Sequence, residues 1–142
     1  MTTKILKKHG ISELTPEDSI AWLASHRPTP TLAELKADAQ SRLASRRWQA
    51  ETGGMMFNGT PVATDDRSKA LIYGARGRSV KFKTASGQFA PLSASETEAL
   101  ADAVADHVQA CFDRESDLLD AINAAETVEE LEAVDINTGW PE

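Results

Sequence analysis

Residues that carry chemistry are rare in this sequence. Its 142 residues include a single cysteine, Cys111, and three histidines. One cysteine excludes a disulfide within the chain and fits a reducing compartment. No segment approaches the ~20 apolar residues of a membrane-spanning helix, and the lysines near the N-terminus precede no apolar stretch of the kind found in a secretory signal. We therefore expect no membrane association and a cytoplasmic location, at least during synthesis.

Aromatic residues are also scarce, at 6% of the chain, whereas hydrophobic residues make up 41%. A chain of this length is expected to fold as one domain with at most a short appended element, and to bury roughly two thirds of its unfolded surface. Its core should then be aliphatic and rich in alanine. Of the three tryptophans, Trp48 is expected to pack on the β-strands. Trp22 and Trp140 either pack on their own chain or anchor a partner, since aromatic side chains often dominate interfaces.

The histidines and the lone cysteine form no recognised metal or catalytic motif. His9, His26 and His107 each lack a second ligand at a metal-binding spacing, apart from Cys111, which follows His107 by four residues on a predicted helix. Both residues of this pair fall within the apolar stripe of that helix. We therefore expect them to pack in the core rather than to bind a metal or to form a Cys–His nucleophilic pair.

The central segment suggests no reaction either. Asp65 and Asp66 are adjacent, so their carboxylates point in different directions, which favours helix capping over acid–base catalysis. The glycines match neither a phosphate-binding loop nor a dinucleotide-binding fingerprint. We expect no enzymatic activity, no cofactor and no metal. Nucleic-acid binding is not expected, because no recognised motif accompanies the basic group around Phe82, which consists of Arg76, Arg78, Lys81 and Lys83.

Charge is divided unevenly along the chain. The net charge is −7, yet residues 1–50 and 51–92 each carry +3 and residues 93–142 carry −13, with Arg114 as their one basic residue. Such asymmetry bears on partners rather than on the fold. Two interpretations stay open: a solvated acidic helix face beside a basic half of the same molecule, or an acidic surface that meets a basic partner.

The first third of the chain predicts two helices. Residues 1–14 have little pattern and are expected to form a loose arm. The pair Thr15-Pro16 is typical of a helix start, and the prolines within residues 28–30 end that short helix. A second helix is predicted over residues 31–51, opened by a capping-box spacing and closed by two glycines.

The middle of the chain predicts a small antiparallel sheet. Residues 55–63 are typical of a β-hairpin whose turn is Asn58-Gly59. A short helix over residues 68–77 should follow. Alternation of apolar and polar residues then predicts strands over residues 80–84 and 88–92, the latter with a proline that favours a strand end or an edge.

One long amphipathic helix dominates the rest. Overlapping capping boxes within residues 93–98 start it, and it is predicted to reach about Ala125. At 1.5 Å per residue, some 30 residues would span about 45 Å, so the helix should either project or pack along a partner helix. A last short helix is expected after Thr127. The apolar stripe of the long helix consists of Leu100, Val104, Val108, Cys111, Leu118 and Ile122, and is widened by His107, Phe112 and Leu119.

These elements define an α+β fold with N-terminal helices, a small antiparallel β-sheet and a long acidic C-terminal helix. We divide the chain into an N-terminal arm with a short helix, residues 1–30, and a single α+β domain, residues 31–142. A homodimer through the helix 95–125 is preferred to a monomer. The residues expected to bind a partner are Leu100, Val104, Val108, Leu118, Trp22 and Trp140.

Several segments carry a family resemblance: RRWQAETGG, VATDDRSKALI and QFAPLSASETEALADAVADHVQACFDRESDLLDAI, with TVEELEAVDINTGWP similar as well. From about Leu32 to Pro141 the chain resembles an uncharacterised domain family of tailed bacteriophages and prophages, found in the tail and tail-fibre gene region. No catalytic residue is assigned to that family. Residues 1–30 fall outside the resemblance.

The resemblance implies a tail-module protein of the host cytoplasm whose partner is a phage tail or tail-fibre protein. We favour a tail-fibre assembly factor, a chaperone-like binding protein, because folding fibres expose apolar strand edges that an amphipathic helix could cover. Two alternatives stay open. The chain is either a small structural component of the virion tail, such as a fibre or baseplate adaptor, or an acidic mimic of nucleic acid that binds a host protein.

Overall fold

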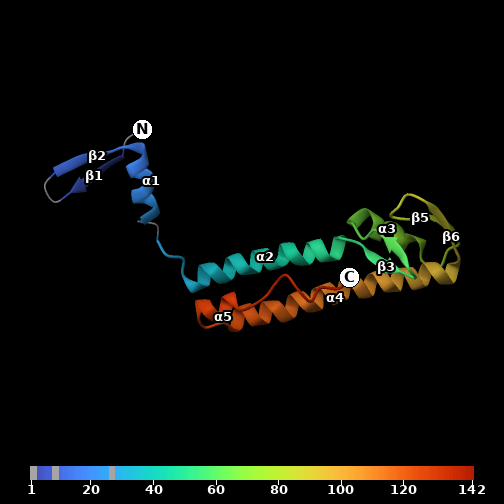
Figure 1. Ribbon diagram of the computed structural model, residues 1–142. Helices are drawn as coiled ribbons and strands as arrows, with labels where there is room; N and C mark the ends of the chain where they lie inside the picture. The colour runs from blue at the N-terminus through green and yellow to red at the C-terminus, as the bar shows by residue number, and fades with distance from the viewer. Residues whose placement is uncertain (1–2, 8–9, 26–27) are drawn as a thin grey trace. The chain divides into compact units, whose positions relative to one another are not determined.

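The structure is a computed structural model that describes residues 3–7, 10–25 and 28–142. The chain divides into two units, Met1–Thr31 and Leu32–Glu142 (Figure 1). Among the described residues there are five helices and three two-stranded antiparallel sheets. The predicted α+β class, with a long C-terminal helix, is confirmed.

The unit Met1–Thr31 begins with a β-hairpin. Strand β1 (Thr3–Lys7) pairs antiparallel with β2 (Gly10–Leu14) over five residues of each strand. The prediction of a loose arm over residues 1–14 is wrong for these two strands, because backbone pairing in a hairpin requires no strong side-chain periodicity. His9 and His26 lie outside the described residues.

Helix α1 (Pro16–Ser25) begins where its capping residue predicts. The Asp18 N–H donates to Thr15 Oγ1 at 3.1 Å, which satisfies one of the free N–H groups of the first turn. Trp22 on this helix is half-buried. The helix ends before Pro28, as predicted.

Two long antiparallel helices frame the unit Leu32–Glu142 (Figure 1). Helices α2 (Leu32–Thr52) and α4 (Ala94–Ala124) lie side by side. The Lys36 ammonium donates to the Asn123 carbonyl at 2.9 Å, across one end of the pair. The long helix therefore does not project, and the helix along which it packs belongs to its own chain.

Local sequence signals determine where these helices begin and end. At the start of α4, Ser93 Oγ accepts the Glu96 N–H and the Glu96 carboxylate accepts the Ser93 N–H, each at 3.2 Å, which confirms the predicted capping box. Helix α2 ends at the glycine pair, as predicted. The last helix, α5 (Val128–Glu132), is capped by Thr127, whose hydroxyl accepts the Glu130 N–H at 3.1 Å.

The helix pair buries two aliphatic cores, and no aromatic side chain in the described part of the chain is among their fully buried members. This confirms the prediction of an aliphatic core. The first core lies between the start of α2, the end of α4 and α5; its buried members are Ala39, Leu43, Leu118, Ile122, Ala125, Leu131 and Ile136. The second lies where α3 and the β-hairpins cover the start of α4; its buried members are Val62, Ile72, Leu100, Ala101 and Val104.

The central β residues form two separate hairpins with α3 (Asp66–Ala75) between them in sequence. Strands β3 (Met55–Phe57) and β4 (Thr60–Val62) are joined by Asn58 and Gly59 at φ 48° and 79°, the left-handed conformation that a two-residue turn of this kind requires. Strands β5 (Val80–Lys83) and β6 (Phe89–Leu92) form the second hairpin. The strands are only three or four residues long, and β4 and β6 each contain a proline that lacks a backbone donor.

Candidate functional site

The end of helix α2 is tied to the loop before α3 by Thr64, which is fully buried. Its hydroxyl donates to the Glu51 carbonyl at 2.7 Å and accepts the Gly54 N–H at 2.9 Å. The chain turns here through Gly53, where a Cβ atom would lie only 2.7 Å from the carbonyl oxygen of Gln49. This joint places α3 beside the junction of α2 and α4.

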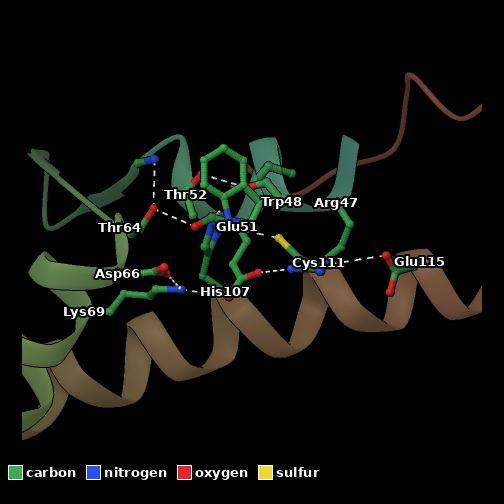
Figure 2. Close-up of polar contacts among 12 residues, drawn as sticks. Arg47, Trp48, Glu51, Thr52, Thr64, Asp66, Lys69, His107, Cys111 and Glu115 are labelled. Atoms are coloured by element: carbon green, nitrogen blue, oxygen red, sulfur yellow. Dashed lines mark hydrogen bonds and ion pairs between the residues drawn. The ribbon is translucent and has the colours of Figure 1, made fainter. Parts of the chain in front are cut away.

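A cluster of charged side chains around the buried pair Glu51 and Lys69 joins the three helices (Figure 2). Glu51, in the last turn of α2, accepts a hydrogen bond from Lys69 of α3 at 2.7 Å and another from Arg47 one turn earlier. Arg47 also reaches Glu115 of α4 at 3.3 Å, and Lys69 lies 3.4 Å from Asp66. Each charge in the cluster therefore faces an opposite charge from another turn or another helix.

The electrostatics of this cluster keep both ends of its central pair charged. Burial by itself would raise the pKa of Glu51 and lower that of Lys69. The hydrogen bonds and charges of Lys69 and Arg47 outweigh it and hold the pKa of Glu51 below its ordinary value of 4.5, while Glu51 and Asp66 hold the pKa of Lys69 above 10.5. The arrangement is an ion-pair network that locks helices together, not a pair poised to exchange a proton near neutral pH.

His107 and Cys111 lie beside this cluster on α4 (Figure 2). His107 Nε2 is 3.1 Å from the Ala50 carbonyl oxygen, which can only accept, so this contact assigns the ring proton to Nε2. Cys111 Sγ lies 4.0 Å from the same nitrogen, which then has no lone pair to take the thiol proton. Burial raises the pKa of the thiol and the Glu51 carboxylate raises it further. Both side chains are buried, which confirms the prediction that they pack in the core.

The adjacent carboxylates Asp65 and Asp66 have separate structural roles. Asp65 caps α3, as predicted: its carboxylate accepts the Ser68 N–H at 3.2 Å, and the hydrogen bonds from Ser68 lower its pKa. Asp66 pairs with Lys69, whereas Arg67 forms no ion pair within the described residues. Across that same part of the chain, no three His, Cys, Asp or Glu side chains are placed to hold a metal, and no helix is both long and apolar enough to cross a membrane.

Among the hollows beside the β-hairpins, two are large. The larger, of about 860 Å³, lies between the end of α2, the hairpin β3–β4 and the C-terminal segment through Trp140. The second, of about 610 Å³, lies between α3 and β5. Large apolar side chains are exposed at both: Met56 at the first, with 56% of its surface accessible, and Leu71 and Phe89 at the second, with 56% and 69%.

Three of the four residues of the long helix that were predicted to bind a partner are buried in the interior of their own chain. Leu100 and Val104 are buried in the second core and Leu118 in the first, whereas Val108 is half-buried. The apolar stripe is thus explained by packing within the chain. Partner binding through these side chains stays a prediction, but it would require α4 to separate from the elements that cover it.

The three tryptophans have different surroundings. Trp140 is half-buried: its indole N–H donates to the Ile136 carbonyl at 2.8 Å, and the Arg46 guanidinium lies 5.4 Å from the ring centre. Trp22 is half-buried within the unit Met1–Thr31. Trp48 is 54% exposed, so the prediction that it packs on the strands is wrong. Arg47 precedes it and points to α4, and successive helical residues are rotated by about 100°, which turns Trp48 outward.

Comparison with known proteins adds one result. Residues 34–138 match the family model of a domain of unknown function, DUF4376. The chain belongs to the DUF4376 family. No curated protein and no solved structure matches it. This match confirms the resemblance to an uncharacterised domain family over residues 34–138. The DUF4376 domain lies within the unit Leu32–Glu142 and contains the whole ion cluster.

Sequence reasoning missed the buried charges of the DUF4376 domain, although a signal was present. Glu51 and Arg47 continue the spacing of the buried Leu43 at four-residue intervals, and Lys69 precedes the buried Ile72 by three. Helical periodicity therefore puts all three charges on buried faces. Their mutual pairing could not be predicted, because it depends on how α3 lies against α2.

Proposed function

We propose that the DUF4376 domain is a non-catalytic protein-binding module that assists the assembly of a phage tail fibre, as the family resemblance implies. The observation that carries this proposal is the exposure of Met56, Leu71 and Phe89 beside two hollows. These side chains lie outside the two buried cores of the domain. Exposed apolar side chains gathered at hollows are typical of protein interaction sites.

The proposed binding surface lies at the end of the domain that carries α3 and the two hairpins. We propose this surface in place of the apolar stripe of α4, because the side chains of that stripe pack against other elements of the same chain. The ion cluster supports a binding role because it holds α2, α3 and α4 in one arrangement: Lys69 pairs with Glu51, and Arg47 pairs with Glu115 of α4. A preorganised surface loses less conformational freedom on binding than a mobile one.

The test is a pull-down with tagged protein from phage-producing cells, with bound proteins identified by mass spectrometry. We expect a tail-fibre or baseplate protein as the dominant partner, and its loss with the double variant Leu71→Ser/Phe89→Ser. Trp48→Ser is the matched control, since Trp48 is similarly exposed but lines neither hollow. A host DNA-binding protein as the dominant partner would instead favour the acidic mimic, and its binding should weaken steeply with salt.

Mass spectrometry of purified particles separates the assembly factor from the virion component. An assembly factor leaves before the particle is complete, so the chain should be absent from it. Recovery of the chain in a fixed ratio to the fibre protein would show a structural component instead.

A further inference from the structure

We propose that the hollow between α3 and β5 binds an extended, acidic segment of the partner protein, which is added as a third strand to the β5–β6 sheet. This inference rests on the proposed function and deepens it, because it names the surface and the chemistry of the segment that is bound.

The register of the hairpin leaves one edge of β5 free. Lys81 lies opposite Pro91, which has no N–H, so these two residues form a pair that exchanges no backbone hydrogen bonds. The Thr84 N–H donates to the Gln88 carbonyl at 2.7 Å, which sets the same alternation from the turn end. The peptide groups of Lys81 and Lys83 therefore point away from β6. Within the described residues, β5 pairs with no strand except β6.

The hollow borders this free edge. All six consecutive residues 80–85 line it, both those whose side chains face the core and those whose side chains face solvent. Successive side chains of a strand point to opposite faces, so the hollow runs along the edge of β5, and it extends over the exposed face as far as Phe89 of β6. Helix α3 forms the opposite wall through Leu71 and Ala75. Six extended residues span about 20 Å, and about 610 Å³ is within the range of ligand-binding sites, so a short strand fits.

The other edges of the two hairpins are less suited to pairing. Pro61 on β4 and Pro91 on β6 each lie in a position whose missing N–H would face outward. A proline there removes a donor that an added strand would need, which is a common means of blocking an edge. The edge of β5 has no such block.

The charged side chains that line the hollow indicate that the bound segment is acidic. Three cations line it, Arg67, Lys81 and Lys83, and its lining residues include no carboxylate. None of the three forms an ion pair within the described part of the chain. Leu71 of α3 adds apolar surface, and Phe89 lies opposite Lys83 on the same face of the hairpin. A strand with alternating carboxylate and apolar side chains presents the carboxylates to Lys81 and Lys83, and the apolar side chains to the other face, which carries Val80 and Phe82.

The experiment is an NMR titration of the ¹⁵N-labelled full chain with a short blocked peptide that alternates glutamate and valine. We expect shifts of the Lys81 and Lys83 amides and their protection from hydrogen exchange. The same peptide with alternate amides N-methylated should lose the effect, because it cannot pair along the edge. So should a peptide with lysine in place of glutamate.

Charge variants test the cations. The double variant Lys81→Glu/Lys83→Glu should lower the affinity for the acidic peptide on the order of tenfold. Arg42→Glu, which alters an exposed arginine on α2 outside the hollow, should leave that affinity unchanged. All these positions are exposed, and circular dichroism should show unchanged folding. Equal binding of the N-methylated peptide would overturn the added strand. Stronger shifts of the same amides by a single-stranded oligonucleotide would overturn the choice of a peptide.

The pull-down separates this inference from the proposed function. Capture of a tail protein by both the unmodified chain and Lys81→Glu/Lys83→Glu would uphold the function and overturn the site. Binding of the acidic peptide at β5 without capture of any tail protein would uphold the site and overturn the function.

Discussion

Glu51 and Lys69 form a 2.7 Å ion pair between the last turn of α2 and α3, with 11% of each side chain accessible to solvent. The pair is joined by Arg47 and through it by Glu115, so one network links three helices. Together with the Arg76–Asp102 ion pair, it ties α3 to the α2–α4 pair. The proposed binding surface depends on it.

Removing one partner of this pair should destabilise the domain. Lys69→Met leaves the Glu51 carboxylate buried beside fewer donors, and we expect the free energy of unfolding to fall by about 2–3 kcal/mol. Glu51→Gln/Lys69→Met, which removes both charges, should recover part of the loss. Urea unfolding followed by circular dichroism measures both. Equal stability of Lys69→Met and the unmodified chain would show that the pair contributes nothing.

The same pair predicts a dependence on pH. The pKa of Glu51 is lower in the folded chain than its ordinary value of 4.5, so the unfolded state binds more protons between the two values. Its contribution to stability is therefore complete above pH 4.5 and is lost as the pH falls through the folded pKa. The free energy of unfolding should fall less steeply with acid in Glu51→Gln than in the unmodified chain. Parallel curves would contradict the assignment.

The turn after α2 should not tolerate a side chain at Gly53. An added Cβ would lie 2.7 Å from the Gln49 carbonyl, so Gly53→Ala should lower the free energy of unfolding by about 1–3 kcal/mol. Gly74→Ala is the matched control: Gly74 lies near the end of α3 with no atom within 4 Å of the added group. That change should be neutral or stabilise by about 0.5 kcal/mol. Thermal melts of the two variants give the comparison.

Substitutions in the α4 stripe should act on folding. Val104 and Leu118 are buried, so Val104→Asp or Leu118→Asp places a charge in an aliphatic core and should unfold the domain. Leu118→Ala should cost about 2–4 kcal/mol. Circular dichroism and sedimentation measured together are decisive: a variant that stays folded but dissociates a dimer would restore the predicted helix-mediated homodimer.

The thiol of Cys111 should react slowly in the native protein. It is buried, and its raised pKa leaves little thiolate near neutral pH. We expect a thiol-specific reagent to label it only at the rate of opening or unfolding, and rapidly in denaturant. Immediate labelling of the folded chain would show that α4 is not covered as the structure has it.

Local patterns predicted most of the elements. The caps at Thr15, Ser93 and Asp65, the Asn58-Gly59 turn and the glycines after α2 are each read from a few neighbouring residues, and the structure contains them all. The pairing of β1 with β2 was not predicted, because it rests on backbone hydrogen bonds, which leave little trace in the side-chain pattern.

The site was less predictable than the elements. The stripe of Leu100, Val104 and Leu118 marks a buried face, but periodicity does not say whether that face is buried by the same chain or by another. The pairing of Lys69 with Glu51 and the edge of β5 beside α3 involve residues far apart in sequence or at the rim of a strand, and neither has a local signal.

By itself the sequence determined the helices, turns and caps, the aliphatic character of the core and the excess of acid in its last third, because these depend on spacing and composition within a few turns of chain. Only the tertiary structure decided what the apolar stripe packs against, which charges are paired and which strand edge stays free. Those outcomes depend on how α2, α3 and α4 come together, and the energy of that packing arises from contacts between distant segments.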